Sequence, residues 1–120
     1  MYHAILIDQE FKDSSFPETF DVFNRKASGS WKIYGVKINS EEIDNVINKI
    51  QENLKEGTWY CHIYNDEDLI VVFKNKVFKV SPHESTWDPI LKYGENLDIP
   101  IEQLDFWPNR FQDERHYFND

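Results

Sequence analysis

The sequence has few of the residues that usually carry covalent or metal chemistry. It contains one cysteine, four glycines and four histidines in 120 residues. A single cysteine cannot form an internal disulfide, and an isolated thiol suits a reducing compartment. The separated glycines exclude a glycine-rich phosphate-binding loop. The histidines are far apart and no Cys-x-x-Cys or His-x-x-His pair occurs, so we predict no metal and no cofactor.

Long apolar segments are also missing. The longest strongly apolar run extends from Leu69 to Phe73 and is far too short to cross a bilayer. The N-terminal stretch MYHAILIDQEF has neither a basic leader nor a long apolar region, which argues against a secretory signal. We therefore expect a soluble, cytoplasmic protein that has no membrane partner.

Basic residues are outnumbered by acidic ones. The chain has 13 Lys and Arg against 22 Asp and Glu, a formal net charge of −9. Such a field repels nucleic acids and anionic membranes unless a basic patch overrides it. The densest basic cluster, Lys74, Lys76 and Lys79, lies near the acidic segment 65–68. No nucleic-acid partner is therefore expected.

Aromatic residues are abundant, at 16% of a chain that is 40% hydrophobic. This supplies enough apolar surface for one ordinary core, and the length suits one domain. We predict a single α+β domain over residues 1–120. It would include an irregular arm near residues 9–30, with a short strand from Phe20 to Phe23 as an option, and an aromatic tail near residues 101–120.

The stretch from Gly57 to Val80 predicts a three-strand antiparallel meander, because β-branched and aromatic runs alternate with turn residues. Turns at 65–68 and at Asn75-Lys76 would oppose Tyr64 with Leu69, and Phe73 with Phe78. One face would then carry Tyr60, His62, Tyr64, Leu69, Val71, Phe73, Phe78 and Val80. The other would carry Trp59, Cys61, Ile63, Ile70, Val72, Lys74, Val77 and Lys79.

Two helices accompany these strands. An apolar stripe at helical spacing predicts the first, with Asn39 and Glu42 capping its start and Gly57 at its end. Its members are Ile43, Val46, Ile47, Ile50 and Leu54. A second helix would begin at Ser85 or Thr86 and end at Asp98 to Pro100. With strands at 3–8 and 31–38, the order predicts a mostly antiparallel α+β fold with a ferredoxin-like β-α-β-β-α core.

The run GTWYCHIYNDEDLIVVFKNKVFKV and the later LDIPIEQLDF resemble a family of small uncharacterised prokaryotic proteins. These carry a similar Trp-Tyr-x-His block ahead of an apolar strand. The resemblance lies between Gly57 and Phe106, and it implies no particular activity.

His62 is the main candidate for a functional side chain. It would share a face with Tyr60 and Tyr64, whose hydroxyls could line a ligand-binding pocket around a group that titrates near neutral pH. The alternative is a core histidine hydrogen-bonded to a tyrosine or a backbone carbonyl. Neighbouring residues on a strand face opposite ways, so Cys61 would not pair with His62 and is expected to be a small buried hydrophobe.

Two groups of acidic residues could bind a cation weakly. One is Asp8 with Glu10, and the other is Asp113 with Glu114 and His116. We expect both groups to be solvated surface charges, since carboxylates are mostly exposed. The segment 65–68 lacks the glycine and distal glutamate of a calcium loop and is expected to be a turn.

The leading functional hypothesis is a non-enzymatic binding or protein-interaction module. Both faces of the sheet are apolar and only two helices are expected to cover them, so one face could pair with a second copy or another protein. The tail rings would either form a partner surface or cover the face of Cys61, Ile63, Ile70 and Val72. They are Phe106, Trp107, Phe111, Tyr117 and Phe118. The alternative is a small enzyme or ligand binder around Tyr60, His62 and Tyr64.

Overall fold

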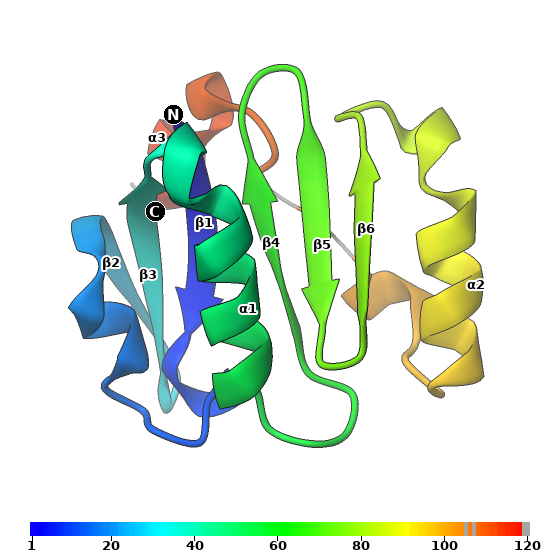
Figure 1. Ribbon diagram of the computed structural model, residues 1–120, viewed down its shortest axis with the longest axis horizontal. Coiled ribbons are helices and arrows are strands. Elements are labelled where there is room, and N and C mark those ends of the chain that lie inside the picture. The colour runs from blue at the N-terminus through cyan, green and yellow to red at the C-terminus, as the bar shows by residue number, and fades with distance from the viewer. Residues whose placement is uncertain (105, 107, 119–120) are drawn as a thin grey trace.

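A six-stranded sheet with helical segments packed on both faces organises the molecule (Figure 1). The computed structural model describes residues 1–104, 106 and 108–118. The strands are β1 (Tyr2–Ile7), β2 (Asp21–Ser28), β3 (Trp31–Ile38), β4 (Tyr60–Tyr64), β5 (Leu69–Phe73) and β6 (Lys76–Val80). The α-helices of the described residues are α1 (Ile43–Asn53), α2 (Asp88–Asn96) and α3 (Glu114–Phe118). The predicted α+β class with an antiparallel sheet is confirmed.

The strand order is β2-β3-β1-β4-β5-β6, and every neighbouring pair is antiparallel. Strands β3 and β4 flank β1, and α1 connects them across one face of the sheet (Figure 1). This crossover is a split β-α-β unit. The hairpin strand β2, the edge strand β6 and the third helix lie outside the predicted two-helix core, so its ferredoxin-like form is not fully confirmed.

The meander forms with the predicted faces but not with every predicted pairing. Strands β4 and β5 pair Tyr64 with Leu69 and Tyr60 with Phe73, as predicted. The prediction for β6 is wrong, because Phe73 pairs with Lys76 and Val71 with Phe78. The loop is Lys74-Asn75 rather than Asn75-Lys76, and moving a two-residue loop by one position shifts the pairing by two. A shift by an even number leaves each side chain on its predicted face.

Helix α1 buries the predicted stripe, and Val46, Ile50 and Leu54 are at most 6% exposed. Its ends differ from the prediction. The Asn39 side chain makes no capping hydrogen bond, and a 3-10 turn at Ser40–Glu42 precedes the helix. The helix ends before Leu54, which turns to extended backbone and bridges to Phe11. Gly57, with a φ of +114°, lies in the loop before β4.

The segment 9–30 has more regular structure than predicted. Two 3-10 turns, Asp8–Glu10 and Phe16–Thr19, lead into the eight-residue strand β2, which pairs with β3 through a Gly29-Ser30 turn. A register shift between Val22 and Asn24 marks a bulge at Phe23. The bulge breaks the two-residue alternation by which strands are identified in a sequence.

Each face of the sheet has its own core. Helix α1 covers the face of Cys61, Ile63, Ile70 and Val72. Helix α2 and the segment after it pack on the opposite face, with Tyr64, Val71 and Phe73. The tail rings therefore cover the second face, not the Cys61 face as predicted. Trp107 lies outside the described residues.

Candidate functional site

The predicted site residues Tyr60, His62 and Tyr64 lie on one face of β4, and the structure brings them together. The His62 and Tyr64 rings stack with centroids 5.7 Å apart. Residues 108–118, called here the strap, pass over this face behind the sheet in Figure 1. His62 and Tyr64 therefore lie beneath the strap, whereas Tyr60 contacts Gln103 and Phe106, which precede it.

His62 is 6% exposed. Its Nε2 lies 2.8 Å from the carbonyl oxygen of Pro108, and because a carbonyl can only accept, Nε2 carries the hydrogen. Burial lowers the pKa of His62 to about 4, although the Pro108 carbonyl acts in the opposite direction. The ring is therefore neutral at pH 7 and has the contacts of the core histidine considered above.

The two tyrosines differ in how their hydroxyls are satisfied. The Tyr60 hydroxyl donates a hydrogen bond to the Gln103 carbonyl. The Tyr64 hydroxyl is buried and has no hydrogen-bond partner of normal geometry among the described residues. Burial, and then the negative charge of nearby Glu114, raise the pKa of Tyr64.

Cys61 is buried on the α1 face, away from His62, as predicted. Burial raises the pKa of its thiol well above the ordinary value, and the negative charge of Glu10 acts in the same direction. A thiol in these surroundings is a weak nucleophile.

The prediction that the acidic groups are solvated is wrong for all four of their carboxylates. Asp8, Glu10, Asp113 and Glu114 are 9%, 3%, 5% and 8% exposed. The 3-10 turn after β1 directs Asp8 and Glu10 inward, where Asp8 accepts a hydrogen bond from the Lys32 amide. In the described residues, no three His, Cys, Asp or Glu side chains gather to hold a metal ion.

Glu10 is the most buried of these acids. One carboxyl oxygen accepts a hydrogen bond from the Ile7 amide, and the other has no partner in the described structure. Burial raises the pKa of Glu10 well above its ordinary value, with the Ile7 hydrogen bond acting against the shift.

A histidine–glutamate pair that sequence analysis missed holds the strap to the sheet. His3 Nδ1 on β1 lies 2.7 Å and 2.8 Å from the two carboxylate oxygens of Glu114. The His3 ring packs between Phe23 and Phe111, with centroids 4.5 Å and 4.4 Å away. The partners are 111 positions apart, and no local pattern indicates such a contact.

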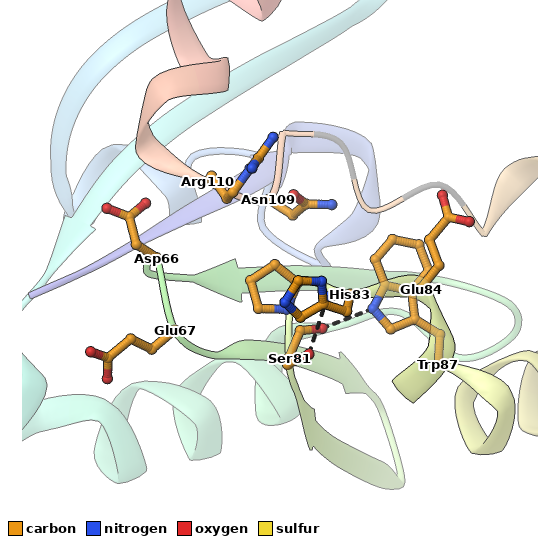
Figure 2. Close-up of a pocket in the computed structure, with 9 residues that line it drawn as sticks. Asp66, Glu67, Ser81, His83, Glu84, Trp87, Asn109 and Arg110 are labelled. Atoms are coloured by element: carbon orange, nitrogen blue, oxygen red, sulfur yellow. Dashed lines mark hydrogen bonds between the residues drawn. The ribbon is translucent and has the colours of Figure 1, made fainter.

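A hollow lies where the strap meets one end of the sheet (Figure 2). This polar hollow has a volume of about 730 Å³, within the range of ligand-binding pockets. The β4–β5 turn, the loop from β6 to α2 and the strap each contribute to it. Its lining residues are Asp66, Glu67, Ser81, Pro82, His83, Glu84, Trp87, Asn109 and Arg110.

Local hydrogen bonds fix the walls of the polar hollow. The Asn65 side-chain oxygen accepts from the amides of Glu67 and Asp68, which sets the acidic turn. The Trp87 indole donates to the Ser81 carbonyl at 2.9 Å and ties the β6–α2 loop together. Asp66 accepts from the Phe111 amide at 3.1 Å, so the turn also anchors the strap.

Negative charge dominates the polar hollow. Its acids are Asp66, Glu67 and Glu84, whereas Arg110 pairs with the buried Asp113 at 3.3 Å. Within the part of the chain that the structure describes, neither Glu67 nor Glu84 forms an ion pair. The sequence prediction identified 65–68 only as a turn. Nothing in the pattern placed it beside the loop at 81–87.

Comparison with protein-family models, curated proteins and solved structures finds no match. The resemblance based on the Trp-Tyr-x-His block therefore stays a prediction. Among the described residues, the structure has no helix long and apolar enough to cross a membrane.

Proposed function

We propose that the protein is a non-enzymatic protein-interaction module, and that the polar hollow receives a cationic side chain of its partner. The observation that carries this proposal is a hollow of about 730 Å³ whose Glu67 and Glu84 carboxylates have no basic partner among the described residues. The net charge of −9 gives the whole molecule a field of the same sign. Such a field speeds the approach of a basic partner.

The partner surface differs from the one that sequence analysis favoured. That argument needed an uncovered apolar face of the sheet. Both faces are covered, since Ile63 and Val72 are fully buried beside α1, and Tyr64 and Val71 are fully buried on the other side. A second copy is therefore not needed to cover the sheet, and the partner we propose is another protein.

The polar side chains of the hollow are arranged for binding rather than for nucleophilic attack. The Ser81 hydroxyl accepts a hydrogen bond from the His83 amide and lies 3.4 Å from the Thr86 hydroxyl. No histidine, aspartate or glutamate side chain of the described hollow forms a hydrogen bond with it. An activated serine needs an adjacent general base.

A small-ligand site around Tyr60, His62 and Tyr64 is the second candidate. The observation that favours it is the buried Tyr64 hydroxyl, which has no partner of normal geometry in the described structure. A ligand would reach this group only after the strap opens. NMR titration of His62, with Tyr60→Phe and Tyr64→Phe for comparison, tests it. A ring that neither titrates nor responds to small molecules down to pH 5 rules it out.

Titration with short homopeptides tests the proposed cation site. We expect hexalysine to shift the amide resonances of the 65–68 turn and the 81–87 loop, and hexaglutamate to leave them unchanged. In the double variant Asp66→Asn, Glu67→Gln, binding of hexalysine should weaken by roughly ten-fold, because two carboxylates of the site are removed.

The matched control is the double variant Glu41→Gln, Glu52→Gln. It removes the same charge from exposed positions before and within α1, away from the hollow. Equal weakening in the two double variants would show only a general charge effect, and that result would overturn the proposal. Absence of hexalysine binding would do so as well.

A further inference from the structure

We infer that the partner segment is amphipathic, and that an apolar side chain next to its cationic one occupies a second hollow alongside α2. This inference deepens the proposed function and depends on it. The second hollow, called here the apolar groove, has a volume of about 590 Å³. Its lining residues are Glu84, Ser85, Trp87, Asp88, Leu91, Ile101, Glu102 and Leu104.

The close approach of two segments forms the groove. Asp98 has a φ of +62° and reverses the chain after α2, so that the 3-10 turn Ile101–Gln103 returns beside the helix. Leu104 packs directly on Gly94 of α2, where a Cβ atom would lie 2.6 Å from the Leu104 Cδ1. A side chain at position 94 would displace the Leu104 side chain, so glycine permits this close approach, and the groove runs along the seam.

The groove has an exposed apolar wall. Ile101 is 69% exposed, whereas Leu104 and Trp87 are 5% and 8% exposed beneath it. The other large hydrophobic side chains exposed in the described structure are Met1 and Trp31, and neither lines the groove. An aliphatic side chain of a partner would remove Ile101 from water and rest on a preformed floor.

The groove and the polar hollow are neighbours. Glu84 and Trp87 line both of them, so a short segment passing over these two residues reaches each hollow. The polar hollow offers carboxylates and the groove offers apolar surface. Together they fit a segment in which a basic residue and an aliphatic residue lie close in sequence.

Charge identifies the occupant of the groove. Glu84, Asp88 and Glu102 surround the apolar wall, and no described lining residue of the groove is basic. These carboxylates form no ion pair with the rest of the described chain. An anionic membrane or an acidic peptide would be repelled, so the fitting partner is a protein segment with lysine or arginine beside its apolar residue.

Two peptides separate the apolar contact from the charged one. The first is Lys-Lys-Leu-Leu-Lys-Lys and the second has serine in place of both leucines. By isothermal titration calorimetry we expect the leucine peptide to bind wild-type protein roughly ten-fold more tightly. We expect Ile101→Ser to remove most of that preference and to leave binding of the serine peptide unchanged.

Trp31→Ser is the matched control, because it removes another exposed apolar side chain, in the β2–β3 hairpin. It should preserve the preference for leucine. A second pair of variants consists of Glu102→Gln and, as its control, the distant Glu52→Gln. The two variants have equal net charge. Only Glu102→Gln should bind the leucine peptide more weakly than wild-type protein does. Both Ile101 and Glu102 are exposed, so their variants are expected to fold normally.

Equal binding of the leucine and serine peptides to wild-type protein would overturn the inference and leave the proposed function standing. Loss of the leucine preference in Trp31→Ser would also overturn it. If neither peptide binds, both the inference and the proposed function fail.

Discussion

At the scale of single residues, the described ionisable side chains of most interest are those that the fold has removed from water. His62 and Glu10 are both buried, and their pKa values are shifted in opposite directions. Burial lowers the pKa of His62 and raises the pKa of Glu10, so it favours the neutral form of both side chains. A core position for His62 was one of the two alternatives drawn from the sequence, whereas the burial of Glu10 was not predicted, because carboxylates are mostly exposed.

His62 should make the protein less stable as the pH falls. The unfolded chain takes up a proton near pH 6.5 and the folded protein only near 4, so unfolding is favoured in between. The loss is on the order of 3 kcal/mol from pH 7 to below pH 4. Urea unfolding across this range measures it, and His62→Gln should reduce the slope. Parallel pH profiles for the two proteins would contradict this assignment.

Glu10 should act in the other direction. The unfolded chain releases its proton near 4.5 and the folded protein at a higher pH, so this group lowers stability as the pH rises through that interval. Glu10→Gln should therefore stabilise the protein at pH 8, because the neutral amide avoids the cost of burying a charged carboxylate. The gain should vanish toward pH 4. A difference in unfolding free energy that does not vary with pH would refute the account.

At the scale of elements, the strap depends on contacts that no local sequence pattern reveals. Its anchors include the contacts of His3 with Glu114, His62 with Pro108 and Asp66 with Phe111, and each joins segments more than 40 positions apart. The cluster of tail aromatics indicated that these residues would be buried. Which face of the sheet they cover follows from long-range topology.

Removing one anchor should loosen the strap without unfolding the sheet. Both carboxylate oxygens of Glu114 contact His3, and Glu114→Gln removes this charged partner. We expect the loss to cost about 1–3 kcal/mol of strap stability. Trypsin cleavage after Arg110 and Arg115 should then become faster. The exposed substitution Glu95→Gln in α2 is the control. If trypsin cleavage at the β5–β6 hairpin became faster by the same factor, the variant would be unfolding globally. That result would contradict a local role for the His3–Glu114 contact.

The elements with regular patterns were predicted well. The stripe of α1, the alternation in β3 and the β4–β5 pairing all follow from hydrophobic periodicity. Strand β2 was largely missed, because its bulge at Phe23 interrupts the alternation. The β5–β6 loop was misplaced by one residue because Lys74, Asn75 and Lys76 are all acceptable in a turn. The hydrophobic periodicity cannot detect a two-residue register shift, because each side chain stays on the same face of the sheet.

At the scale of the whole molecule, the candidate site depends on segments that meet only in the folded chain. The acidic turn, the β6–α2 loop and the strap form the polar hollow, and the return of the chain after α2 forms the apolar groove beside it. The sequence indicated an acidic protein without cofactor motifs and favoured an interaction module. It could not indicate where a partner would bind, because the apolar sheet face that it suggested is covered in the folded chain.

The most direct test uses Glu84, which lines both hollows. Calorimetric titration of Lys-Lys-Leu-Leu-Lys-Lys into wild-type protein and Glu84→Gln should show affinity reduced by roughly ten-fold or more in the variant. Glu52→Gln, with the same net charge, should bind like wild type. Equal affinities for all three proteins, or no binding to wild type, would contradict the account.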